Sequence, residues 1–180
     1  MILKRLRRES SGYTLVELLV VLAIFTTVVT ALVSLFTSGA KAELDMNRRF
    51  EAQQNARLAL DRMRRELHCS SGITAGAGAV GSVTVALPSQ CPSSGGAAIS
   101  VVYDMSQVSA NRWKLRRTVG TTTIPIADYI TSGTPFTYTA QSASSRAILH
   151  VNLPVNVNPN EGWKSWRLVD DIVLRNTLRQ

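Results

Sequence analysis

Gly12-Tyr13-Thr14-Leu15-Val16-Glu17 introduces an apolar stretch that runs to Phe36, and this segment decides the organisation of the chain. Four basic residues precede it, at positions 4, 5, 7 and 8. Between Tyr13 and Phe36 the only charged side chain is that of Glu17. As a helix, these 24 residues would span about 36 Å, and the hydrocarbon core of a bilayer is about 30 Å thick. We therefore predict a membrane-spanning helix whose basic flank stays in the cytoplasm.

The carboxylate of Glu17 is expected to pair with a positive charge, because a charge within a membrane segment is costly and is usually paired or functional. Glu17 lies about one helical turn from Tyr13. Cleavage of the chain after Gly12 would give Tyr13 a free ammonium group. That group could meet Glu17 of the same chain or of a neighbouring chain, so the spacing suggests a charge pair that depends on cleavage.

This N-terminal pattern resembles the type IV prepilin signature, in which a short basic leader, a glycine, an aromatic residue and Thr-Leu-Val-Glu precede about twenty apolar residues. The family includes major and minor pilins and the pseudopilins of type II secretion and of competence. The resemblance is strong over Met1–Phe36 and weaker up to Leu67. Tyr13 is a mild departure from the family, where phenylalanine is commoner.

The resemblance implies a role for three residues. Gly12 would precede the cut made by a prepilin peptidase, and Tyr13 would become the N-terminus and be N-methylated. Glu17 would assist assembly by meeting the N-terminus of a neighbouring subunit. The implied partners are the prepilin peptidase/methyltransferase, other pilin or pseudopilin subunits, and the membrane.

The resemblance also implies a location. The chain would cross the inner membrane once, with its N-terminus in the cytoplasm and its C-terminal domain outside, before it joins a pilus or pseudopilus. The alternative is an uncleaved signal anchor. A Sec-type signal peptide fits worse, because its apolar core is shorter and is followed by small residues at a cleavage site.

Residues 40–67 are expected to continue the helix, because they are rich in good helix formers. Ala56, Leu60, Met63 and Leu67 recur along one face, with Phe50 just upstream near the same stripe. An apolar face on a helix in water needs a partner, and the natural one is a sheet built from the rest of the chain. The predicted helix of about 55 residues matches the long spine of pilins.

Three hydroxyl residues, Thr26, Thr30 and Ser34, recur at intervals of four along the apolar segment. One interpretation is a contact face for a neighbouring helix. The other is that each hydroxyl bonds back to a carbonyl of its own helix. The sequence leaves both open.

The C-terminal part reads as β structure. Residues 73–96 look like a long connection with one short strand at Ser82–Leu87. Further strands are expected near residues 98–104, 112–119, 121–126, 136–139, 147–155 and 163–176. In the clearest, Leu149, Val151 and Leu153 face one way and His150 the other; in residues 112–119, Arg117 interrupts the apolar side.

The predicted fold class is therefore α+β, with one long N-terminal helix packed on an antiparallel β-sheet domain. The predicted division is a leader at 1–12, a transmembrane and assembly helix at 13–36, an amphipathic continuation at 37–69 and a β-rich globular domain at 70–180.

Two cysteines, Cys69 and Cys91, would lie outside the membrane, where an oxidising environment favours a disulfide. Closing the loop between them would stabilise the domain by roughly 3 kcal/mol in the chain-entropy model. Two separate thiols are the alternative. Metal binding is not predicted, because two cysteines and a distant histidine make no ligand spacing.

The net charge of +8 falls to +5 if the leader is removed, because 16 basic and 11 acidic side chains remain. Arginines cluster at positions 62, 64 and 65 and at 116 and 117, so DNA contact is an alternative. It is the less favoured one, because cations near a helix C-terminus complement its dipole. Asp61 and Glu66 also adjoin the first cluster.

Catalytic motifs are absent from the sequence: there is no phosphate-binding loop, no His-Glu-x-x-His and no Gly-x-Ser-x-Gly. His68 and His150 are far apart, and neighbours such as Asp170 and Asp171 point to opposite faces of a strand. We therefore predict no enzyme, no catalytic residue, no cofactor and no metal site.

The sequence favours a minor pilin-like structural subunit of a type IV pilus, of the W type. The alternatives are a J-type pseudopilin of type II secretion, a DNA-uptake competence pseudopilin, and an anchored domain that never polymerises.

Overall fold

The computed structural model describes residues 12–158 and 165–175. Contacts divide the chain into two units, Met1–Leu44 and Asp45–Gln180, and each is described by itself. Helix α1 spans Leu15–Cys69 without interruption and therefore has residues in both units. It begins two residues later than expected, because Thr14 is its cap: the amide of Glu17 donates a hydrogen bond to Thr14 Oγ1 at 3.3 Å.

The described residues of the second unit also contain a 3-10 helix and nine strands, and every strand pairing is antiparallel. The order across the sheet is β1-β3-β4-β5-β6-β8-β7-β2, and β9 pairs with β8. The fold is therefore α+β, as predicted. The elements are β1 (Gly72–Ala75), β2 (Ala79–Val80), β3 (Ser82–Leu87), η1 (Pro92–Ser94), β4 (Ile99–Ser109), β5 (Arg112–Val119), β6 (Thr122–Ile130), β7 (Phe136–Thr139), β8 (Ile148–Val155) and β9 (Trp166–Val173).

The expected bounds of β3, β5 and β7 are confirmed, but the prediction of an unstructured connection before β3 is wrong. That region contains β1 and β2. Both strands are short and have no charged side chains, so an alternation of polar and apolar residues cannot be recognised in them. Strand β6 runs four residues beyond the range expected from the sequence, 121–126, and contains Pro125, a residue typical of an edge or a strand end. Proline is tolerated there because the register of β5 and β6 shifts beside it. The start of the strand expected near residues 163–176 lies outside the described residues.

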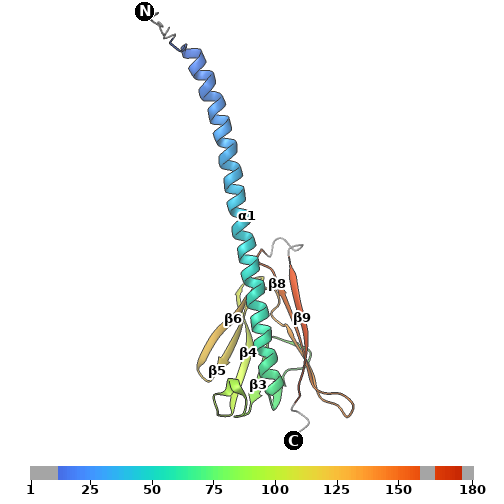
Figure 1. The fold of residues 1–180 in the computed structure, drawn as a ribbon. Helices are drawn as coiled ribbons and strands as arrows, with labels where there is room; N and C mark the ends of the chain where they lie inside the picture. Colours follow the sequence, from blue (N-terminus) through green and yellow to red (C-terminus); the bar gives the residue numbers. More distant parts are fainter. Residues whose placement is uncertain (1–11, 159–164, 176–180) are drawn as a thin grey trace, which may run out of the picture. The chain divides into compact units, whose positions relative to one another are not determined.

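The second-unit part of α1 packs on the sheet, with β5 and β6 to one side of it and β9 to the other (Figure 1). The predicted apolar face is confirmed, since Ala56, Leu60, Met63 and Leu67 are all buried. Phe50 is not part of that face, because 62% of it is exposed. The sheet supplies the other side of the core with alternate residues, among them Val85, Val101, Leu115, Leu149, Val151 and Leu153.

A polar cluster lies inside this core. Glu66 of α1 is buried, and its carboxylate accepts hydrogen bonds from the Tyr103 hydroxyl at 2.5 Å and from Arg117 Nε at 3.1 Å. Burial lowers the pKa of Arg117, but its hydrogen bond to Glu66 and the charge of that carboxylate more than offset this and raise the pKa above its ordinary value. Arg117 interrupts the apolar side of β5 because its charge partner is on the helix.

The disulfide between Cys69 and Cys91 joins the last residue of α1 to the segment between β3 and β4, with Cα atoms 5.8 Å apart. It therefore attaches the end of the helix covalently to the sheet connection. Loop closure of this kind stabilises a domain chiefly by restricting the unfolded chain.

Candidate processing and assembly segment

Gly12 and Tyr13 lie before the helix, and both are exposed. Tyr13 is 82% exposed. The peptide bond between them is therefore outside the regular hydrogen bonding of α1 and is open to solvent. A Cβ built on Gly12 would meet no heavy atom within 4 Å, so nothing in the described chain itself blocks this bond.

Glu17 lies in the first turn of α1 and is exposed. Its position suits the helix, because a negative side chain in the first turn complements the positive end of the helix dipole. The Thr14 cap sets where the helix begins and so places Glu17 in its first turn. The structure thus brings Tyr13, Thr14 and Glu17 into one short segment at the helix start.

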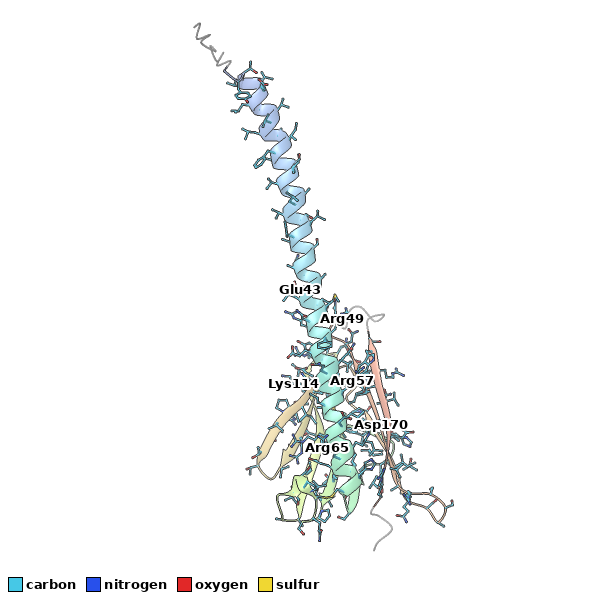
Figure 2. All side chains as sticks on the ribbon, in the orientation of Figure 1. Glu43, Arg49, Arg57, Arg65, Lys114 and Asp170 are labelled. Atoms are coloured by element: carbon cyan, nitrogen blue, oxygen red, sulfur yellow. A yellow bond between two sulfur atoms is a disulfide. The ribbon has the colours of Figure 1, made fainter. Side chains whose placement is uncertain are left out.

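The apolar side chains that follow Glu17 are exposed on all sides of α1 in the first unit (Figure 2). Among the described residues, α1 is the one helix whose length and apolar composition suffice to cross a membrane. A helix with apolar residues all round suits a lipid environment or a bundle of similar helices. This segment therefore fits a single-pass membrane anchor.

Two of the three hydroxyls of the polar stripe, those of Thr26 and Thr30, bond to their own helix. Thr26 Oγ1 donates to the Ala23 carbonyl at 2.9 Å, and Thr30 Oγ1 donates to the Thr26 carbonyl at 2.7 Å. These bonds favour the second of the two interpretations given above for the polar stripe. With their protons used inside the helix, Thr26 and Thr30 are poorer donors to a neighbouring helix.

The arginine clusters that raised the question of DNA are largely paired with carboxylates. Arg64 binds Asp170 of β9 at 2.7 Å, and Arg62 lies 3.4 Å from the Glu66 carboxylate. Figure 2 shows Arg65 on the helix and Asp170 on the neighbouring strand. Hydrogen bonds and the nearby charge of Asp170 raise the pKa of Arg64.

The second cluster behaves in the same way. Arg116 of β5 forms an ion pair with Asp104 of β4, and Arg117 is taken up by Glu66. The Trp113 indole, a candidate to stack on a base, is half-buried. It packs against Gly133 so closely that a Cβ added to that glycine would lie 2.7 Å from the ring. This pairing and packing weigh against a DNA surface at these residues.

Asp170 and Asp171 point in opposite directions, as predicted for neighbours on a strand. Asp170 binds Arg64 of the helix, whereas Asp171 lies 2.6 Å from His150 Nδ1.

Among the side chains that the structure describes, no three of the types His, Cys, Asp or Glu are grouped so as to hold a metal ion.

The functional residue that the sequence does not reveal as such is Glu66, which in the sequence stands only as a neighbour of the arginine cluster. A signal was present, because Glu66 lies three residues after Met63 and next to Leu67, on the buried face of the helix. A carboxylate in that place requires a buried cation opposite it, and the unexplained Arg117 was the candidate.

Comparison with protein families places a match at residues 7–33, to the prokaryotic N-terminal methylation motif. The match covers the second half of the leader with Arg7 and Arg8, then Gly12, Tyr13, Glu17 and most of the apolar segment. Comparison of the chain with curated proteins and with solved structures found no match. The matched motif is one of pilin-like structural proteins rather than of an enzyme family. By this motif and its helix, the N-terminal segment is that of a type IV prepilin-like protein.

Proposed function

We propose that the chain is a minor pilin-like structural subunit of a type IV pilus. The observation that carries this proposal is the methylation motif at residues 7–33, at the start of an exposed apolar helix whose first turn contains Glu17. The described residues of the second unit offer a sheet domain whose prominent charges are mostly paired internally, which suits a structural role.

In this proposal, residues 1–12 are a leader, residues 13–36 form the membrane and assembly helix, and residues 37–69 join it to the β domain at 70–180. The basic leader stays in the cytoplasm, and the domain is exported. A prepilin peptidase/methyltransferase cuts the exposed bond after Gly12 and methylates Tyr13. The disulfide between Cys69 and Cys91 then forms in the oxidising compartment outside the membrane.

Assembly would move the apolar helix from lipid into a bundle of helices from sister subunits. Glu17 cannot remain an unpaired charge in that setting without a cost of a few kcal/mol. The ammonium group of Tyr13 on a neighbouring subunit would pair with it. Because one such pair forms only at one axial offset, Glu17 would set the register between subunits.

The proposal is tested by the mass of the N-terminal peptide of the full chain, recovered from membranes of cells with and without a prepilin peptidase. We expect a peptide that begins at Tyr13 and is heavier by one methyl group, only in cells that contain the enzyme. Gly12→Val should leave residues 1–12 attached, because a branched side chain then adjoins the bond to be cut. Gly39→Val is the matched control, since Gly39 is also open to solvent but lies far from the cut.

An intact N-terminus in both kinds of cell would contradict the proposal and would favour an anchored domain that does not polymerise. If the peptide is cut and methylated, the machine is identified by fractionation. Recovery of the chain in pili sheared from the cell surface supports the pilus subunit. Its absence from pili, together with a loss of protein secretion when the chain is deleted, would favour a J-type pseudopilin instead.

A further inference from the structure

Three polar side chains meet on the outward face of the sheet, on three neighbouring strands. Thr139 ends β7, His150 is the third residue of β8, and Asp171 lies on β9. Leu149 and Val151 are fully buried, so His150 between them points away from the core. In the strand register, Asp171 stands directly opposite His150, and Thr139 lies diagonally across from it.

The distances join the three groups in one chain of contacts. His150 Nδ1 is 2.6 Å from Asp171 Oδ1, and His150 Nε2 is 3.3 Å from Thr139 Oγ1. Of the two neutral tautomers of His150, a carboxylate beside Nδ1 favours the one with its proton on that nitrogen. In that tautomer Nε2 carries the lone pair, and the Thr139 hydroxyl is the donor of their contact. The order of hydroxyl, imidazole and carboxylate is the one that activates a nucleophile by an adjacent base.

Access to this group is open. Thr139 is exposed, and the side chains of His150 and Asp171 are 41% and 62% exposed. Thr137 offers an internal comparison, since it is also an exposed threonine of β7 and stands directly opposite His150 in the register. The ring nevertheless contacts Thr139. The partner of His150 Nε2 is therefore not simply the residue directly opposite in the strand register, Thr137, but its neighbour Thr139.

We propose that Thr139 is a covalent modification site, whose hydroxyl accepts an acyl group from an activated ester or thioester. This inference does not depend on the proposed function in a pilus. The contacts among Thr139, His150 and Asp171 carry it.

The step balances as a single acyl transfer. Thr139 Oγ1 attacks the acyl carbonyl carbon while His150 Nε2 takes the hydroxyl proton. The tetrahedral adduct collapses, the bond from carbon to the leaving oxygen or sulfur breaks, and the leaving group departs with the electron pair. The product is an ester on Thr139, and the imidazolium, held by the Asp171 carboxylate, returns its proton to water. No oxidant or reductant takes part.

The expected acceleration of Thr139 acylation depends on His150 acting as a general base. A well-placed base inside an active site accelerates a proton transfer by about 10²–10⁴-fold. Here the base is exposed to water, so we expect less than that range. Thr139 should therefore react about tenfold faster than Thr137.

The experiment treats the full chain in detergent with p-nitrophenyl acetate. Release of p-nitrophenolate is followed by absorbance, and acetylated residues are located by peptide mass spectrometry. The chain is compared with Thr139→Val, Thr137→Val, His150→Gln and Asp171→Asn. Valine keeps the branched shape that suits a strand, so the two threonine variants differ only in which hydroxyl is lost. Circular dichroism verifies that each variant is folded.

We expect acetyl-Thr139 as the main product, about one p-nitrophenolate per chain, and loss of this burst in Thr139→Val but not in Thr137→Val. His150→Gln should slow the labelling about tenfold, and Asp171→Asn should slow it to a smaller extent. Equal labelling of Thr139 and Thr137 would overturn the proposal. So would an unchanged rate in His150→Gln, or a burst retained in Thr139→Val, which would make His150 itself the nucleophile.

Discussion

Glu66 of α1 and Arg117 of β5 form an ion pair in the core, with Arg117 Nη2 at 3.0 Å from the Glu66 carboxylate. The Glu66 side chain has no exposed surface and that of Arg117 is 9% exposed. The two residues are 51 positions apart in the chain. Their contact therefore fixes how the last turns of the helix lie on the middle of the sheet, where purely apolar side chains would tolerate sliding.

Removing one member of this pair should be costly. Arg117→Met leaves the buried carboxylate of Glu66 with only Arg62 as a cation, 3.4 Å away on a side chain that is 40% exposed. We therefore expect the free energy of unfolding to fall by about 3 kcal/mol. Arg116→Met, at the preceding position, should cost only about 0–1 kcal/mol, because the pair of Arg116 with Asp104 is partly open to solvent. Urea unfolding of the full chain in detergent measures both. Equal losses in the two variants would contradict the assigned role of the buried pair.

Stability should fall at alkaline pH through Tyr103. Burial raises the pKa of the Tyr103 hydroxyl, and its hydrogen bond to the Glu66 carboxylate raises that pKa further. The folded chain therefore holds this proton more tightly than the unfolded chain, whose tyrosine pKa is about 10. The stabilisation is complete below about pH 10 and is lost as the pH rises beyond it, by up to about 1.4 kcal/mol per pH unit.

Tyr103→Phe isolates this contribution. We expect the variant to be less stable at neutral pH, because Glu66 loses a donor, but to lose less stability between about pH 9 and pH 11. Unfolding curves recorded across that range supply the comparison. Parallel pH profiles for the two proteins would show that Tyr103 does not carry the alkaline loss.

Gly81 should not accept a side chain. Its added Cβ would lie 2.4 Å from the Gly133 carbonyl oxygen, at the point where the chain passes from β2 to β3. A backbone atom cannot move aside as the end of a side chain can, so Gly81→Ala should lower the free energy of unfolding by about 1–3 kcal/mol or more. Gly72→Ala is the control, because a Cβ there meets nothing within 4 Å. A thermal midpoint that falls equally in both variants would argue against the close contact.

Loss of the disulfide should destabilise the second unit without changing its fold. Replacing both cysteines, Cys69→Ser with Cys91→Ser, releases a loop with 21 intervening residues and should cost about 3 kcal/mol. The double variant also tests whether the loss of stability is due to the disulfide. Addition of a reductant should lower the denaturation midpoint of the native chain to that of the variant and leave the midpoint of the variant itself unchanged.

Substitution of Glu17 should separate membrane insertion from assembly. Glu17→Gln removes the charge but keeps the shape, so the chain should still insert and be processed, while its recovery in filaments should fall about tenfold, as expected for the loss of a charge pair. Glu43→Gln is the matched control, since Glu43 is an exposed acid on the same helix beyond the apolar stretch. Immunoblots of membrane and sheared filament fractions measure the ratio. Normal incorporation of the Glu17→Gln variant would remove Glu17 from the assembly mechanism.

The sequence by itself determined the N-terminal segment, the long helix and several strands. These features depend on local order: an apolar run of membrane length, a four-residue recurrence such as that of Ala56 and Leu60, and the strict alternation in β8. Each is set by neighbours along the chain, because the periods of helix and strand are properties of the backbone. The cleavage and assembly roles of Gly12, Tyr13 and Glu17 came from resemblance and stay predictions.

Only the tertiary structure decided the features that join distant residues. Arg117 faces the core because Glu66, on another element, compensates its charge, and no local pattern contains that information. Strands β1 and β2 are too short to show a period and exist because β3 and β7 supply their hydrogen bonds. The meeting of Thr139, His150 and Asp171 likewise required the register of three strands, which is fixed by burying one face of each on a common core.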